Sequence, residues 1–504
     1  MSSDLTVTGP GRSGRSGRSR GSSMLLATAL LAALAARLAF LGSKSLWADE
    51  AYVSGLTSLP LGEAMHLFSE GTPHPGGGMA FLWLSARLFG WSEEGLRLLG
   101  ALFTASAAAP LFLFLRRRTG TAGAFWATLC WALSPLCVSL GQEAWIYGPM
   151  AALSFWAVYS ADLAWRGSIP ALAGFVAASA AGVLVQSMFL LTVAASAGLY
   201  FTLPRTGRTG TARLVSALAA VLAASVPVLL PLGDEMAGRS ARMAASGASG
   251  PDLPGLLRGS LSAATRLIPG GLLPESWRLM ASAPRYLAAF AAGLSVQAVS
   301  FAATIRKPRD ARLLIWMATV FALPFLVFLV DEPSARQFPL AWLAFTCTLA
   351  FASSRLRWFG PASSAVCLAL LAGYYGMTVF PYHRSDYRSA AASVDSGFSA
   401  GDAVVLTGAR SMTQAWSFYS RSGAEVLDTT GGNPYLSEEE SEPASDPVRL
   451  ADSLLSSGRR VWVVQDYWGG PAISDLIPRG IPVPQPAGST IRVVRVEPGQ
   501  TQAD

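Results

Sequence analysis

The sequence is poor in charged residues, and its few cysteines lie in unexpected places. Of its 504 residues only 14% are Asp, Glu, Lys or Arg, whereas a soluble globular protein usually carries about 25%. The four cysteines (Cys130, Cys137, Cys347 and Cys367) all fall inside apolar stretches, which argues against a disulfide framework or a cysteine metal site. A glycine-rich nucleotide fingerprint is also missing, so we expect no nucleotide cofactor.

In place of charge, the sequence has uncharged stretches of membrane-spanning length. About 20 apolar residues cross the hydrocarbon core as a helix. Such stretches cover 98–115, 119–142, 144–161, 167–204, 214–233, 286–305, 313–330, 337–354 and 358–383, and the first span, 24–41, carries a single arginine. The 167–204 stretch is long enough for two crossings, with a turn near Val185-Gln186-Ser187. We therefore predict an α-helical polytopic membrane protein with about 11 transmembrane helices.

The positive charges orient the chain in the membrane. A net charge of +7 could indicate a nucleic-acid partner in a soluble protein. Here the Lys and Arg residues gather between spans, as in cytoplasmic loops, so we expect no nucleic acid. The basic Gly- and Ser-rich segment 1–23 is predicted to be a disordered cytoplasmic tail. If segment 76–90 crossed the membrane, the Arg116-Arg117-Arg118 triplet would lie outside. The segment is too short to span, so we predict that it lies along the outer interface as an amphipathic helix and that the triplet is cytoplasmic.

The C-terminal region, 384–504, has a different character from the membrane domain, 24–383. Strand-like stretches alternate there with helix-like ones, which is typical of a compact α/β unit. The strands are AVVLTG (403–408), VWVVQD (461–466) and IRVVRV (491–496), and the helices are 387–395 and 447–457. The same orientation makes this small domain extracytoplasmic. We thus expect a multi-pass protein of the plasma (inner) membrane with a cytoplasmic N-terminus and an extracytoplasmic C-terminus.

Acidic residues are scarce in the first half of the chain, so their positions are informative. Asp49 and Glu50 follow the first span, and Glu143 lies at the outer end of a later helix. The predicted topology places all three on one face. Carboxylates brought together from separate loops can bind a hard divalent cation such as Mg²⁺ or Mn²⁺, or share acid–base work. Ordinary solvation at the interface is the alternative for each.

Several basic and aromatic residues share that face. His74, before the interfacial helix, could ligate a metal or contact phosphate, or could be a solvated loop histidine. Arg336, at the outer end of a span, fits a phosphate partner or snorkelling. Arg37, within the first span, needs a partner such as Glu50 or a bound phosphate unless it snorkels. Tyr147 suits an interfacial aromatic belt or carbohydrate stacking.

Taken in order, short motifs of this chain form a recognisable set. They are LWADEAY (46–52), His74-Pro75, RLFG (87–90), Glu93-Glu94, Leu96-Arg97-Leu98, Leu133-Ser134-Pro135, QEAWIY (142–147) and DYRSAA (386–391). The set resembles the GT-C superfamily of membrane glycosyltransferases, in particular bacterial relatives of protein O-mannosyltransferases and lipid A aminoarabinose transferases. The resemblance covers roughly 24–410.

The resemblance implies a chemistry. Such enzymes pass a sugar from a polyprenyl phosphate in the outer leaflet to an acceptor, usually with inversion. Asp49 would act as base on the acceptor hydroxyl or help Glu143, the second-loop acid, to hold a metal. Glu50 would position the site. The candidate donor-phosphate residues are Arg336, Arg37, His74 and Tyr147.

The sequence also departs from the family pattern. Glycines follow His74-Pro75, Trp145 replaces an arginine, and Gln186 stands near the turn where a His or Tyr is common. We expect a glycosyltransferase that uses a polyprenyl-phosphate-linked sugar and a glycan, lipid or protein acceptor, in contact with membrane lipids. A transporter or flippase of lipid-linked glycans ranks second, because the acids lie at span ends and no internal repeat is apparent. A non-catalytic member of the same fold is the third reading.

Overall fold

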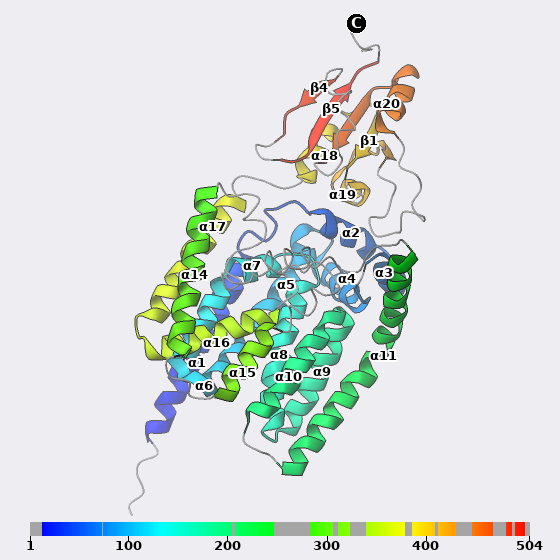
Figure 1. Ribbon diagram of the computed structural model, residues 1–504. Helices are drawn as coiled ribbons and strands as arrows, with labels where there is room; N and C mark the ends of the chain where they lie inside the picture. Colours follow the sequence, from blue (N-terminus) through cyan, green and yellow to red (C-terminus); the bar gives the residue numbers. More distant parts are fainter. Residues whose placement is uncertain are drawn as a thin grey trace, which may run out of the picture.

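In the computed structural model, long apolar helices form a bundle that carries a small α/β domain at one end (Figure 1). The structure describes residues 13–72, 74–203, 207–245, 283–305, 311–322, 339–378, 386–408, 412–429, 446–466, 480–485 and 489–498. The bundle helices are α1 (Ser13–Leu38), α5 (Glu93–Ser106), α6 (Ala108–Leu133), α8 (Tyr147–Trp165), α9 (Ile169–Val185), α10 (Leu190–Leu199), α11 (Gly207–Ala245), α14 (Ala283–Ile305), α15 (Ala311–Ala322), α16 (Pro339–Arg355) and α17 (Phe359–Thr378). Helix α6 packs against α1, α16 and α17, so it lies within the bundle.

Within the described residues, four helical stretches are long and apolar enough to cross a membrane. They are Arg20–Leu38, Glu93–Leu133, Gly210–Val228 and Leu287–Ile305. The second stretch runs through α5 and α6. Helix α6 is kinked at Gly120, whose φ of 81° interrupts the helix two residues after Arg118. The stretch therefore corresponds to two of the predicted crossings. The other predicted crossings fall on α8, α9, α10, α15, α16 and α17, and the count of eleven remains a prediction.

Two details of the bundle bear on the sequence predictions. The 167–204 stretch forms two helices, α9 and α10, and Gln186 between them has an extended backbone, so the predicted turn is confirmed. At the N-terminus, α1 begins at Ser13. The disordered tail was predicted over 1–23, partly outside the described residues, and its disorder remains a prediction. Once a helix is nucleated, extending it by a residue costs little, so the span helix continues into this polar segment.

Four short helices gather between the bundle and the α/β domain (Figure 1). They are α2 (Ala48–Thr57), α3 (Leu61–Gly71), α4 (Gly77–Phe89) and α7 (Pro135–Gly141). Helix α4 corresponds to the predicted interfacial segment 76–90. With 13 residues it is roughly 20 Å long, too short for a hydrocarbon core of about 30 Å.

The C-terminal domain is built on a five-stranded mixed sheet in the order β2-β1-β3-β5-β4. The strands are β1 (Ala403–Thr407), β2 (Glu425–Asp428), β3 (Val461–Gln465), β4 (Ile481–Val483) and β5 (Arg492–Val496). Strand β1 pairs in parallel with β2 and β3, and β5 is antiparallel to β3 and β4. Its helices are α18 (Tyr387–Gly397), α19 (Met412–Tyr419) and α20 (Pro447–Ser456). The three predicted strands and two predicted helices are all present.

Candidate functional site

The best-defined polar contact of the site is a buried ion pair between Glu50 and Arg97. Glu50 lies in the first turn of α2 and is 1% exposed, and Arg97, on α5, is 2% exposed. The Nε of Arg97 donates to Oε1 of Glu50 at 2.8 Å, and its Nη2 donates to Oε2 at 2.6 Å. Such a two-pronged arrangement fixes both position and orientation of the carboxylate.

Glu50 is also bonded to two backbone N–H groups. Ala144 donates to its Oε1 at 2.7 Å, and Trp47 donates to its Oε2 at 3.3 Å. Burial raises the pKa of Glu50, but the Arg97 guanidinium and these hydrogen bonds lower it, and together they hold the pKa below its usual range. Glu50 is therefore an ionised anchor, which suits the positioning role that the resemblance implies.

The anchor joins the two loops that carry the other predicted carboxylates. Asp49 precedes Glu50, and Glu143 precedes Ala144, whose N–H lies 2.7 Å from the Glu50 carboxylate. Asp49 and Glu143 are both half-buried. The structure thus brings the two loops together at one end of the bundle. That their carboxylates converge within about 10 Å, close enough to share an ion or a bridging water, remains a prediction.

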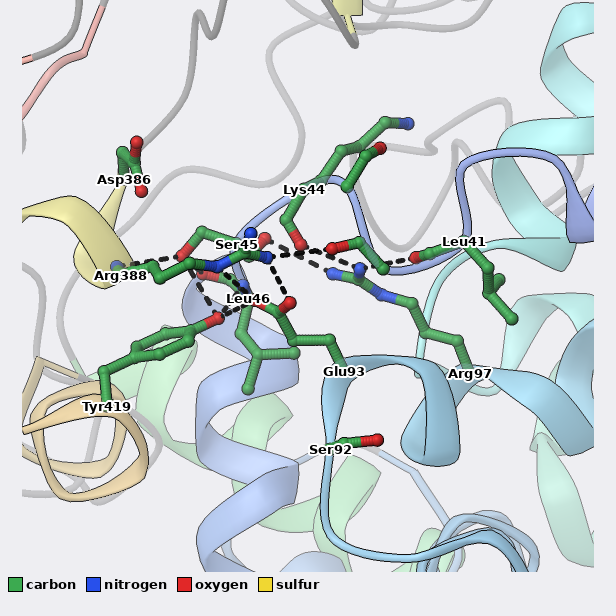
Figure 2. Close-up of polar contacts among 12 residues, drawn as sticks. Leu41, Lys44, Ser45, Leu46, Ser92, Glu93, Arg97, Asp386, Arg388 and Tyr419 are labelled. Atoms are coloured by element: carbon green, nitrogen blue, oxygen red, sulfur yellow. Dashed lines mark hydrogen bonds and ion pairs between the residues drawn. The ribbon is translucent and has the colours of Figure 1, made fainter.

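Arg97 fastens the loop between α1 and α2 as well. Its Nη1 donates to the carbonyls of Leu41 at 2.9 Å and Lys44 at 2.8 Å, and its Nη2 donates to that of Ser45 at 3.3 Å (Figure 2). One guanidinium therefore holds both this loop and the first turn of α2. In the sequence, Arg97 stands out only as part of the Leu96-Arg97-Leu98 motif. The signal that could have singled it out is an arginine at the outer start of an apolar span, where positive charge is unusual.

His74 lies in a buried aromatic group. It is 9% exposed, so the alternative of a solvated loop histidine is wrong. Its Nδ1 lies 3.3 Å from Oε1 of Gln186, and its ring centroid lies 5.9 Å from that of Trp145 and 6.3 Å from those of Tyr147 and Phe68. Trp145 and Gln186, two departures from the family pattern, are therefore neighbours of the predicted phosphate-binding residues His74 and Tyr147.

Arg37 occupies a different place from the one expected. It is 0% exposed, which excludes snorkelling. Its guanidinium carbon lies 4.5 Å from the ring centroid of Trp131, and its Nη1 donates to the carbonyls of Ala33 at 3.0 Å and Ala132 at 3.1 Å. The suggested pairing with Glu50 is wrong, because Arg97 reaches Glu50 from α5 while Arg37 contacts α6. A contact with phosphate remains a prediction. Arg336 lies outside the described residues.

The predicted metal site has few protein ligands. Within the described part of the chain, no group of three or more His, Cys, Asp or Glu residues could hold a metal ion. Mg²⁺ is commonly bound through one or two carboxylates, with water and substrate phosphate completing its shell. That Asp49 and Glu143 hold such an ion remains a prediction.

Comparisons with known proteins agree with the resemblance. Residues 73–230 match the family model of dolichyl-phosphate-mannose-protein mannosyltransferases. A comparison with curated proteins finds no match. ArnT from Cupriavidus metallidurans is similar in its apo crystal structure, at 12% identity and a TM-score of 0.56. It is also similar in the crystal structure bound to undecaprenyl phosphate, at 13% identity and a TM-score of 0.57. Each comparison covers 96% of this chain and 99% of ArnT.

Arabinofuranosyltransferase AftD from Mycobacteria is 15% identical, with a lower TM-score of 0.48 over 96% of this chain and 40% of that one. At these identities the ArnT structures show the fold alone. Together with the family match, they confirm the resemblance to GT-C membrane glycosyltransferases. The chain is an integral, multi-pass membrane protein whose fold is similar to that of ArnT.

Proposed function

We propose that this protein is a glycosyltransferase that takes a sugar from a polyprenyl-phosphate donor and passes it to an acceptor hydroxyl on the extracytoplasmic side. The observation that carries the proposal is the buried Glu50–Arg97 pair with its bond to Ala144, which joins the loops of Asp49 and Glu143. The fold shared with ArnT, seen in one structure with undecaprenyl phosphate, supports a donor of this kind.

Asp49 is assigned to the acceptor. Its carboxylate accepts the proton of the acceptor hydroxyl while the hydroxyl oxygen forms a bond to the anomeric carbon of the sugar. The bond from that carbon to the phosphate oxygen breaks, and its electron pair leaves with the polyprenyl phosphate. Attack opposite the leaving group inverts the anomeric centre.

The donor phosphate is assigned to Arg336, His74 and Tyr147, with Arg37 as a more deeply buried candidate. A guanidinium and a phosphate form short, charge-assisted hydrogen bonds, and burial strengthens them. In the alternative role of Asp49, that residue and Glu143 would together hold a divalent cation, Mg²⁺ or Mn²⁺, which would stabilise charge on the leaving phosphate. His74 itself is 9% exposed and lies among the rings of Trp145 and Tyr147.

The alternatives are a transporter or flippase of lipid-linked glycans and a non-catalytic member of the fold. Transporters typically place charges near the middle of the membrane, where broken helices bind the substrate. Here the ion pairs Glu50–Arg97 and Asp162–Arg118 lie toward opposite ends of the bundle, which supports the transferase. The acceptor could be a glycan, a lipid or a protein.

The test is transfer of label from radiolabelled polyprenyl-phosphate sugars in the presence of membrane extract, followed by identification of the product. Asp49→Asn keeps the shape of the side chain but removes its basicity, so turnover should fall by on the order of 10² to 10⁴. Donor binding should change little. Arg336→Ala should instead weaken donor binding, because a charge-assisted contact is lost. Full transfer by Asp49→Asn would show that another residue is the base.

A further inference from the structure

The α/β domain contacts the bundle through Arg388 and Tyr419, which meet at one carboxylate. The Nε of Arg388, on α18, donates to Oε1 of Glu93 at 3.2 Å, and its Nη2 forms an ion pair with Oε2. Tyr419, on α19, donates its hydroxyl hydrogen to the same Oε1. Glu93 is 8% exposed. Its charge is therefore balanced mainly by Arg388 and Tyr419 of the α/β domain rather than by water (Figure 2).

The Tyr419 hydroxyl also binds the loop that leads to Asp49. The backbone N–H of Leu46 donates to it at 2.7 Å, and the hydroxyl of Ser45 donates at 3.2 Å. These residues come directly before Trp47, the N-cap of α2. Burial and the Glu93 carboxylate raise the pKa of Tyr419 far above its usual value, so the hydroxyl keeps its proton and can donate. With one bond given and two accepted, its position is fixed.

Loop residues 41–46 are thus held from both sides. From the bundle, Arg97 donates to three of their carbonyls. From the α/β domain, Nη2 of Arg388 donates to the carbonyl of Gly42 at 2.9 Å, and its backbone N–H donates to Ser45 Oγ at 3.4 Å. Helix α19 also packs directly on α2. The first turn of α2 therefore depends on the docked domain for its position.

We propose that α18 and α19 position the Asp49 loop for sugar transfer, with Tyr419 and Arg388 as positioning residues that act through Ser45 and Leu46. The inference rests on the proposed function, because it takes Asp49 as the base. A base works only within hydrogen-bond reach of the proton that it removes. A displacement of about 1 Å can lower the rate by about 10²-fold. Docking of the domain would thus complete the site.

The first experiment compares Tyr419→Phe with Tyr200→Phe in the full-length protein. Tyr419→Phe keeps the ring, whose centroid lies 4.9 Å from that of Phe418, and removes only the hydroxyl. Tyr200 is a matched control, since its hydroxyl contacts Thr211 Oγ1 at 3.1 Å at an exposed place. Tyr419→Phe should lower kcat by about 10- to 10²-fold with an unchanged KM for the donor. Tyr200→Phe should keep the parental kcat, and an equal loss in both variants would contradict the proposal.

A second variant guards against a folding defect. Arg388→Lys keeps the charge beside Glu93 but loses the fork that also reaches Gly42. Its kcat should fall less than that of Tyr419→Phe. The double variant Asp49→Asn/Tyr419→Phe should lose much less kcat than the product of the two single fold-losses. The reason is that Tyr419→Phe acts by displacing the Asp49 carboxylate, which Asp49→Asn has already removed. If the fold-loss in kcat of the double variant equalled the product of the two single fold-losses, Tyr419 would act independently of Asp49.

A spin label at Ser43→Cys tests the positioning without any assay of transfer. Tyr419→Phe should sharpen its spectrum, because the loop becomes more mobile, and Tyr200→Phe should not. An unchanged spectrum overturns the positioning role whatever the activity. A sharper spectrum with parental kcat overturns the link to catalysis. Absence of transfer by the parent protein contradicts the proposed function, whereas the label still decides whether the domain fixes the loop.

Discussion

At the scale of single residues, the Glu50 carboxylate accepts hydrogen bonds from three parts of the chain: the side chain of Arg97 and the backbones of Ala144 and Trp47. Removing two charges from water costs several kcal/mol per ion, and only good geometry with further hydrogen bonds offsets that cost. A hydrophobic pair of the same volume could stabilise the fold as well. What it could not do is orient two loops around one point, and that is where the candidate site lies.

Glu50→Gln should reduce stability in a pH-dependent way. It leaves Arg97 buried without its carboxylate, at a cost of about 3–5 kcal/mol. Although burial raises the pKa of Glu50, Arg97 and the hydrogen bonds hold it below the unfolded value of about 4.3. The stability that the ionised Glu50 contributes is therefore fully present above the unfolded pKa. It is lost as the pH falls through the lower pKa of the folded state. The Tm difference from the parent should be constant from about pH 7 to 5 and shrink below about pH 4.

The measurement is thermal unfolding in detergent at a series of pH values. The double variant Glu50→Gln/Arg97→Met is the control, because it removes both charges and should recover part of the lost Tm at neutral pH. If the parent and Glu50→Gln differed equally at pH values of about 7 and about 3, the ion pair would not be the source of the difference.

The residues of the site differ in how far sequence could predict them. Asp49, Glu50 and Glu143 were found because acidic residues are scarce and theirs flank apolar spans. The partner of Glu50 was missed, since Arg97 lies 47 positions away and only the packing of α5 against the loops brings them together. For the same reason the sequence offered Arg37 as a partner. Glu93 and Arg388 were quoted as motif residues, but a contact 295 positions apart cannot be read from spacing.

At the scale of elements, the start of α4 explains the run of glycines after His74-Pro75. A Cβ on Gly77 would lie 2.5 Å from the carbonyl oxygen of Leu184, and one on Gly78 would lie 2.5 Å from Cγ2 of Ile146. The helix can approach α9 and the α7–α8 turn this closely only without side chains. The glycines are therefore required by the close packing of α4 against α9 and the α7–α8 turn.

Gly77→Ala should destabilise the protein, because a backbone carbonyl blocks the new methyl group and α4 must shift away from α9. Gly62→Ala in α3 is the matched control. Nothing lies within 4 Å of a Cβ there, and the change should be neutral or stabilise by up to about 1 kcal/mol. Thermal unfolding of both variants in detergent is the measurement. A Gly77→Ala protein as stable as Gly62→Ala would contradict the close approach.

Elements were predictable from sequence where their pattern was long or uninterrupted. The apolar helices and strands β1, β3 and β5 were found, because each is a run of residues suited to burial. Strands β2 and β4 were missed, and they have only four and three residues. Helix α19 was missed too. Such short elements are stabilised by tertiary contacts, as α19 is by α2, rather than by local propensity.

At the scale of the whole molecule, the two ends of the bundle carry different charges. Helix α8 starts beside the candidate site and ends near Asp162, which is fully buried. Its carboxylate pairs with Arg118 at 2.8 Å, Arg166 at 3.2 Å and Arg117 at 3.5 Å. With 19 residues the helix is roughly 28 Å long, close to the hydrocarbon thickness of about 30 Å. The arginine-rich end therefore suits the cytoplasmic side and the site end the outer side.

This orientation can be tested by labelling single cysteines in sealed vesicles of known sidedness. The four native cysteines are buried, so background labelling should be low. Exposed positions for new ones are Ser456 on α20, Leu88 on α4, and Trp358 between α16 and α17. Trp358 belongs to the arginine-rich end, because the following turn of α17 packs on Trp126, just past the kink at Gly120. A membrane-impermeant maleimide added to the extracytoplasmic side should modify Ser456→Cys and Leu88→Cys.

The same reagent should modify Trp358→Cys only after the membrane is permeabilised, because a charged maleimide does not cross the hydrocarbon core. Labelling of Leu88→Cys with Ser456→Cys would place α4, the carboxylate loops and the α/β domain in one compartment, as transfer from an outer-leaflet donor requires. Labelling of Trp358→Cys from outside, with Ser456→Cys protected, would reverse the orientation. The candidate site would then face the cytoplasm, and an extracytoplasmic acceptor could not reach Asp49.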